Sequence, residues 1–136
     1  KNNSIMKKLL ILLFSILISF NSYGEWTWEG ESAANSSNWY IDLYKTRKVD
    51  NYIYYWTMSV LLKPDIDGDL SYVNYLQGDC KLMRTMNLSE FYYTQPMGAG
   101  NATTNSIENP FWTYPIPNSG TELLLESACN YANSMP

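Results

Sequence analysis

The chain of 136 residues carries 13 acidic and nine basic residues, and it contains no histidine. The lack of histidine excludes Ser-His and Cys-His nucleophile pairs and every histidine-based zinc site. Twelve tyrosines and five tryptophans favour sheet structure and adhesive surfaces over a helical bundle.

The N-terminal 24 residues have the pattern of a bacterial signal peptide. We place the biological start at Met6, with residues 1–5 upstream of it. Two lysines then precede an apolar run, Leu9–Phe20, which is shorter than the roughly 20 residues of a membrane span. Ser22 and Gly24 are small residues at the −3 and −1 positions of a cleavage after Gly24. The alternative is a helix that stays in the mature protein.

Cleavage after Gly24 would leave residues 25–136, enough for one domain with a modest core. It removes three lysines and no acidic residue, so six basic residues face 13 acidic ones and the net charge becomes −7. Such an acidic domain disfavours nucleic acid and anionic lipid as partners. We divide the mature chain into a flexible segment, 25–38, and a domain, 39–136.

Several strands are expected between residues 26 and 93. Trp26–Trp28 can form an edge strand, and a further strand begins at 39–43. Lys48–Asn51 has turn composition. A strand over 70–77 is followed by a bend at Gly78-Asp79, and residues 80–93 form either a strand pair or one long bent strand.

The clearest strand pattern covers Tyr52–Leu62. Every even position is apolar or aromatic, whereas the odd positions are mixed. The period of two therefore predicts that the even set faces the core. The odd face keeps enough apolar area to be a contact surface, or it packs against the N-terminal segment.

The stretch PDIDGD, residues 64–69, raises the question of a calcium site. A calcium loop that begins at Asp65 needs glycine at its sixth position and glutamate at its twelfth, where the chain has Leu70 and Leu76. We therefore interpret the stretch as a hairpin turn and predict no metal site.

The C-terminal third combines a loop, a short strand and a helix. Thr94–Asn109 is rich in glycine, proline, asparagine and threonine and is predicted to be a loop. Phe111–Tyr114 forms a short strand. Ser119 and Glu122 have the spacing of a capping box, which predicts a helix over residues 120–132 with Cys129 on its apolar stripe. The expected fold is α+β: a small antiparallel meander with one C-terminal helix packed on one face.

The two cysteines, Cys80 and Cys129, predict one disulfide in an exported protein, which would tie the helix to the sheet. The alternative is two free thiols. If the strand after Cys80 were regular, Arg84 would share its inward face and would need a partner such as Asp79 or a helix glutamate, unless a bulge turns it outward.

A set of segments resembles the bacterial surface-adhesin protein E family. In order they are WYID with a hairpin turn, YYWTMSVLLKP, QGDCKLMR, PMGAG, WTYPIPNSGTE and LLLESAC, and they cover nearly all of the chain after Trp39. The resemblance implies an exported antiparallel sheet whose concave face holds a C-terminal helix by a disulfide, with Cys80 and Cys129 at the matching positions. It also implies an adhesin that binds host extracellular-matrix proteins and plasminogen and forms dimers.

The expected function is an exported, non-catalytic binding module at the bacterial surface or in the periplasm. Its contact candidates are the aromatic residues on the outer face of the sheet and the loop Thr94–Asn109. No catalytic, cofactor or metal residue is predicted, and no individual binding residue can be named from the sequence. The alternative is an envelope domain that self-associates as a homodimer without an adhesive ligand. A small hydrolase or metal-dependent enzyme is a third, weaker alternative.

Overall fold

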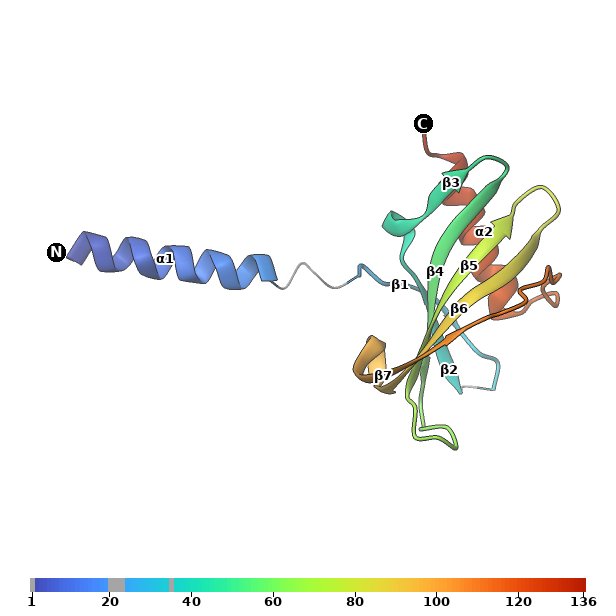
Figure 1. Ribbon diagram of the computed structural model, residues 1–136, viewed down its shortest axis with the longest axis horizontal. Coiled ribbons are helices and arrows are strands. Elements are labelled where there is room, and N and C mark those ends of the chain that lie inside the picture. Colours follow the sequence, from blue (N-terminus) through green and yellow to red (C-terminus); the bar gives the residue numbers. More distant parts are fainter. Residues whose placement is uncertain (1, 20–23, 35) are drawn as a thin grey trace.

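The computed structural model describes residues 2–19, 24–34 and 36–136, without the side chains of residues 11–19. An antiparallel sheet is covered on one face by the C-terminal helix (Figure 1). The elements are α1 (Asn2–Ser19), β1 (Thr27–Glu31), β2 (Ser37–Ile41), η2 (Leu43–Lys45), β3 (Arg47–Val49), β4 (Tyr52–Leu61), β5 (Ser71–Asp79), β6 (Arg84–Gln95), η3 (Pro96–Gly98), β7 (Ala99–Ser106) and α2 (Gly120–Asn133).

The sheet is a meander in which each strand pairs with neighbours that are close in sequence. Its order is β1-β2-β4-β5-β6-β7, and β3 pairs with β4 beside β2. All pairings are antiparallel. The predicted α+β fold with one C-terminal helix is therefore confirmed.

The described N-terminal part begins with a helix. Helix α1 contains the apolar run up to Ser19 and stands apart from the sheet (Figure 1). Among the helices of the described residues, none has both the length and the apolar character of a membrane span. Ser22 of the predicted cleavage site lies outside the described residues. Residues 25–38, expected to be flexible, contain edge strand β1 and the start of β2, so the expectation of an edge strand near Trp26–Trp28 is confirmed.

Helix α2 follows its predicted local signals. The Oγ of Ser119 accepts a hydrogen bond of 3.3 Å from the backbone N–H of Glu122, which caps the helix. The carboxylate of Glu122 reaches back to the N–H of Asn118 at 3.1 Å, one residue before the cap. The face of the helix that packs on the sheet consists of Leu124, Leu125, Ala128, Cys129 and Ala132.

A disulfide joins Cys80 to Cys129, with the two Cα atoms 5.7 Å apart. Cys80 lies in the turn between β5 and β6 rather than in a strand, and β5 runs on through the predicted bend at Gly78-Asp79. Residues 84–95 form one strand with a register shift opposite Tyr75 and Leu76. The disulfide thus ties the helix to the tip of a hairpin.

The predicted facing of β4 is wrong. The odd positions Ile53 and Tyr55 are buried against α2, together with Leu76 of β5. The even aromatic positions face away from the helix and are half-buried. The physical reason is Gly78, which pairs with Ile53: a methyl group there would lie 3.0 Å from Leu125 Cδ1, so the missing side chain lets the helix approach this face.

Two further predictions need correction. Half of the expected loop Thr94–Asn109 is strand β7, which pairs with β6 along the edge of the sheet. The expected strand Phe111–Tyr114 is reduced to a single bridge between Thr113 and Thr85. In both places the backbone pairs with a neighbouring strand although the side chains stay largely exposed.

Candidate binding surface

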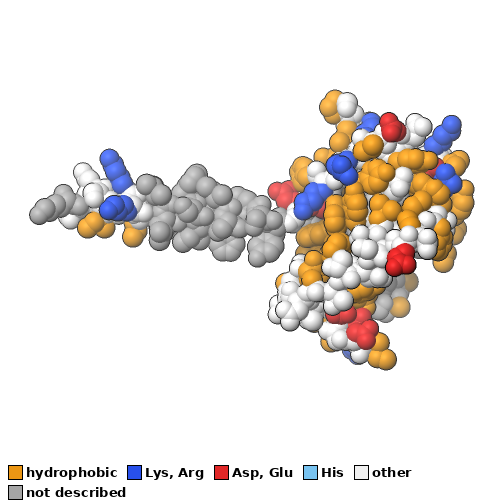
Figure 2. All heavy atoms as spheres, in the orientation of Figure 1, with side chains coloured by type: hydrophobic (Ala, Val, Ile, Leu, Met, Phe, Trp, Pro, Cys, Tyr) orange, Lys and Arg blue, Asp and Glu red, His pale blue; other side chains and the backbone are white. Residues whose placement is uncertain are grey.

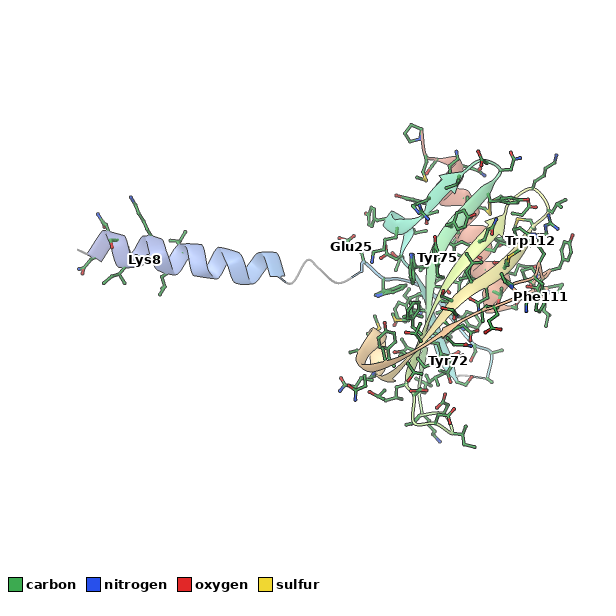
Figure 3. The ribbon with its side chains drawn as sticks, in the orientation of Figure 1. Lys8, Glu25, Tyr72, Tyr75, Phe111 and Trp112 are labelled. Atoms are coloured by element: carbon green, nitrogen blue, oxygen red, sulfur yellow. A yellow bond between two sulfur atoms is a disulfide. The ribbon has the colours of Figure 1, made fainter. Side chains whose placement is uncertain are left out.

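An aromatic face occupies the side of the sheet opposite α2. It contains half-buried rings from β4, β5 and β6 and from the segment before α2. We define the aromatic face as Tyr52, Tyr54, Trp56, Tyr75, Phe91 and Trp112. Figure 2 shows hydrophobic side chains gathered over this side of the sheet, and Figure 3 shows Tyr75 and Trp112 upon it.

The rings of the aromatic face contact one another across strands. Trp56 stacks on Tyr75 with ring centroids 4.6 Å apart, and the ring of Phe91 lies 5.8 Å from that of Trp56. Tyr54 lies 6.1 Å from Tyr75. Cross-strand aromatic pairs of this kind stabilise a sheet. The aromatic residues at the even positions of β4 are therefore half-buried by one another, without a helix packed over them.

Two arginines flank the rings. The guanidinium of Arg47 lies 5.6 Å from the centre of the Tyr54 ring, and its Nη2 donates a 2.8 Å hydrogen bond to the Tyr75 hydroxyl. Arg47 is exposed and has no carboxylate partner within the residues that the structure describes. The aromatic face therefore carries positive charge although the chain as a whole is acidic.

The second arginine, Arg84, lies 4.4 Å from the centre of the Trp112 ring. Its Nε donates a 3.0 Å hydrogen bond to Oδ2 of Asp79, so the expected pairing with Asp79 is confirmed. The inward orientation, which would follow only from a regular strand after Cys80, does not occur. The neighbour Thr85 faces the helix side, where its Oγ1 meets Tyr55, and Arg84 therefore points to the opposite face.

The carboxyl group of Asp79 is shaped by its surroundings. Its Oδ1 accepts hydrogen bonds of 3.1 Å from the N–H groups of Lys81 and Leu82. Burial opposes ionisation of Asp79, but these N–H groups and the Arg84 guanidinium outweigh it, so the pKa of Asp79 is lowered. The pair fixes the hairpin between β5 and β6 and positions Arg84 beside Trp112.

A hollow of about 540 Å³ lies at the other end of the same side of the sheet. It lies between the N-terminal segment and η3, and Val73 and Tyr93 form its floor. Gly98 of η3 lies over Met58 and Val73. This contact explains why Met58, an even position of β4, is fully buried while Trp56 is not.

The candidate loop of the sequence analysis becomes an exposed edge strand. All eight residues of β7, Ala99–Ser106, are exposed, and the strand contains no charged residue and no proline. An uncharged edge strand is an available template for a further strand.

The PDIDGD stretch forms the tip of the hairpin between β4 and β5, as the turn interpretation predicts. Oδ1 of Asp65 accepts hydrogen bonds of 2.9 Å from the N–H groups of Asp67 and Asp69, and its other oxygen accepts one from Tyr72. The Tyr72 hydroxyl is the main cause of a lowered pKa at Asp65. The carboxylate oxygens of the three aspartates lie within 4.8 Å of one another. The turn consumes much of the hydrogen-bonding capacity of Asp65.

Sequence reasoning missed most of the aromatic face. It placed Tyr52, Tyr54 and Trp56 in the core, and it gave no role to Arg47 or Trp112. Gly78 could have indicated the correct face of β4, because it opens space for the helix opposite an odd position of that strand. Using it requires the pairing register of β4 and β5, which the residues alone do not show.

Comparisons with known proteins agree with this architecture. A protein-family model described as surface-adhesin protein E matches residues 26–130. A structure of Haemophilus influenzae protein E is similar with a TM-score of 0.57 and 12% identity, over 80% of this chain and 89% of that chain. Its crystal form II gives 0.56 and 14%, over 69% and 82%. No curated protein matches. The family match starts at residue 26, ahead of the expected domain boundary at residue 39, and it includes β1.

Proposed function

The chain belongs to the surface-adhesin protein E family, and from this premise we propose that its aromatic face is the surface with which it binds a protein ligand. The observation that carries the proposal is a row of half-buried rings beside the guanidinium of Arg47, which has no carboxylate partner among the described residues. Tyrosine, tryptophan and arginine are the residues that dominate the energetics of protein interfaces.

The chemistry of this surface favours a partner with both apolar and acidic groups. The rings supply apolar contact area at a small loss of side-chain entropy, because each is already held by its neighbours. Arg47 adds a donor fork for a carboxylate. By its family resemblance, the ligand class is a host extracellular-matrix protein, and the site of action is the outer surface of a bacterium, reached after removal of the leader.

We propose a non-catalytic role. In the part of the chain that the structure describes, the clustered carboxylates Asp65, Asp67 and Asp69 lie on a hairpin tip and not in a cleft. The small cavity of about 90 Å³ beneath the start of α2 is lined by Tyr55 as its one titratable group. Neither place supplies an acid and a base that converge on a substrate.

Self-association is the second candidate, favoured by the uncharged edge of β7. A second copy could add its own edge strand there and form a homodimer with a continuous sheet. Light scattering of the processed protein would reveal this as a concentration-dependent mass. In this case Thr104→Lys, which places a charge on the edge, should lower the mass to that of a monomer.

The proposed ligand surface is tested by a binding panel of immobilised matrix proteins and plasminogen. Tyr54→Ser and Arg47→Glu should each weaken binding at least about tenfold, as expected for central interface residues. The matched controls are Ile66→Ser, an exposed apolar residue on the hairpin tip, and Lys63→Glu, an exposed lysine near it; both should bind as the unmodified protein does. Unchanged binding by both face variants would reject the aromatic face.

A further inference from the structure

Asp42 holds a buried carboxylate at the corner between β2 and η2. Its side chain is 2% exposed, and neither of its carboxylate oxygens accepts a hydrogen bond from the residues that the structure describes. The nearest cation, Nζ of Lys45, is 3.8 Å from Oδ2, on a side chain that is 58% exposed. A buried carboxylate is stable when its oxygens are paired and hydrogen-bonded. Asp42 has one long ion pair, to a largely exposed lysine, and no hydrogen bond among the residues that the structure describes.

The N-terminal segment passes directly over this carboxylate. A methyl group on Gly24 would lie 2.7 Å from Oδ2 of Asp42 and 3.6 Å from Nζ of Lys45. The backbone at Gly24 therefore packs against the acid with no room for a side chain. The nitrogen of Glu25 is two covalent bonds from the Cα of Gly24, so it lies in the same neighbourhood. Figure 3 labels Glu25 where the chain enters the sheet.

We propose that Asp42 is the binding site for the α-ammonium group that leader cleavage creates on Glu25. Cleavage after Gly24 consumes one water: the Gly24–Glu25 amide bond breaks, the leader leaves with the Gly24 carboxylate, and the new amine of Glu25 takes up a proton. Before cleavage residue 25 offers one neutral N–H. After cleavage it offers three donors and a positive charge to two oxygens that accept no hydrogen bond among the described residues.

This ion pair makes the folded domain sensitive to its own processing. In the precursor the buried carboxylate has only the long ion pair with Lys45, whereas in the processed protein the α-ammonium group pairs with it directly and ties the start of the chain to the corner between β2 and η2. The tie holds the segment that leads into edge strand β1. The inference depends on cleavage after Gly24 and does not depend on the proposed ligand surface.

Two other groups face the same corner and must be distinguished in the test. Lys45 could approach Asp42 by a small movement of its flexible side chain. The Oγ1 of Thr46 is also buried without a partner among the described residues, but it carries no charge. If Lys45 satisfied Asp42 alone, the amino terminus would titrate as a free amine.

The test uses the exported protein, with its N-terminal residue established by mass spectrometry. The α-amino group is titrated by NMR, and its pKa should lie about one unit or more above the usual value near 7.7. Asp42→Asn should return that pKa to the usual range, while Asp50→Asn, a change at an exposed turn, should leave it raised. An ordinary α-amino pKa in the unmodified protein, or a start at another residue, would overturn the proposal.

A second measurement leaves Asp42 unchanged, in case Asp42→Asn does not fold. Acetylation of the amino terminus of the processed protein removes its charge, and the protein should then melt at a lower temperature at pH 7. A form that retains Gly24 displaces the amine by one residue and should also melt lower than the processed form. Equal melting temperatures for all three forms would reject the ion pair.

Discussion

The hydroxyl of Tyr55 and the Oγ1 of Thr85 lie 2.9 Å apart beneath α2, and they connect β4 to β6 across the intervening strand. Thr85 donates in turn to the carbonyl of Gln77 at 3.1 Å, so the tyrosine is the donor of this pair. The ring can cross β5 because it passes over Gly78, which has no side chain: a methyl group there would lie 3.1 Å from the ring. The absence of a side chain at Gly78 thus makes room on this face of the sheet both for helix α2 and for the ring of Tyr55.

The first prediction concerns alkaline stability. Burial raises the pKa of Tyr55 from 10.0 to about 12, although the hydrogen bond with Thr85 lowers it in part. Because the folded pKa exceeds the unfolded one, the contribution of Tyr55 is complete below pH 10 and is lost as the pH rises towards 12. A shift of this size corresponds to about 3 kcal/mol. Urea unfolding between pH 8 and 11 should show about half of this loss, since pH 11 lies midway between the unfolded and the folded pKa.

Tyr55→Phe should cost about 1 kcal/mol at pH 8 through the lost hydrogen bond, and its stability should fall less steeply above pH 10. Tyr72 also has a raised pKa, chiefly from burial and then from its bond to Asp65, so the variant keeps some alkaline sensitivity. Tyr44→Phe, at an exposed tyrosine, is the control. Parallel slopes for the unmodified protein and Tyr55→Phe would contradict the prediction.

The second prediction concerns Gly78. A methyl group there would lie 2.9 Å from Ile53 Cγ1 and 3.0 Å from Leu125 Cδ1, so Gly78→Ala must displace the helix or the strand. Overpacking of this kind costs about 1–3 kcal/mol. Gly30→Ala is the milder comparison, because its methyl would meet the half-buried Leu123 at 3.2 Å. The free energy of unfolding in urea should fall more for Gly78→Ala than for Gly30→Ala. If Gly78→Ala lost no stability, Gly78 would not explain which face of β4 is buried.

The features that the sequence predicted correctly are those with local signals. The capping pair Ser119 and Glu122 lies within four residues and marks the start of α2. The two cysteines allow one disulfide, and it is formed. The hairpin tip at Asp65 follows from turn chemistry in the same way. None of these inferences requires knowledge of which strand lies beside which.

The features that it missed depend on pairing. Strand β7 has no apolar alternation because both of its faces are exposed, and it is a strand only because its backbone pairs with β6. The facing of β4 depends on the register that brings Ile53 opposite Gly78. The apolar pattern could not reveal this, because aromatic rings that stack on each other are as apolar as a core.

The third prediction concerns acid. The pKa of Asp79 is lowered, since its bonds from Leu82, Arg84 and Lys81 outweigh its burial. A lowered folded pKa means that the stabilising effect of Asp79 is present above its ordinary pKa of 3.8 and disappears as the pH falls below that value. Asp79→Asn should therefore be less stable than the unmodified protein at pH 7, and the gap should narrow below pH 4.

Chemical unfolding from pH 7 to 2.5 measures this gap, with Asp50→Asn as the exposed control. The carboxyl of Asp65 has a lowered pKa as well, so the variant at 79 retains part of the acid response. If the difference in free energy of unfolding between Asp79→Asn and the unmodified protein stayed constant with pH, the ionised form of Asp79 would not be what stabilises the hairpin and its bond to Arg84.

The fourth prediction concerns the disulfide between Cys80 and Cys129, which are separated by 49 positions. In the chain-entropy model, opening a loop of that length costs about 4 kcal/mol, and the double substitution Cys80→Ser with Cys129→Ser should lose an amount of that order.

A helix of 14 residues is marginal by itself in water, but α2 also buries an apolar face on the sheet. The double variant should therefore remain folded in mild conditions with α2 docked, and urea should unfold it at a much lower concentration. A reductant should shift the unmodified protein to the same midpoint and leave the variant unchanged. If the reduced protein and the double variant unfolded at the midpoint of the oxidised protein, the helix would be held by its packing alone.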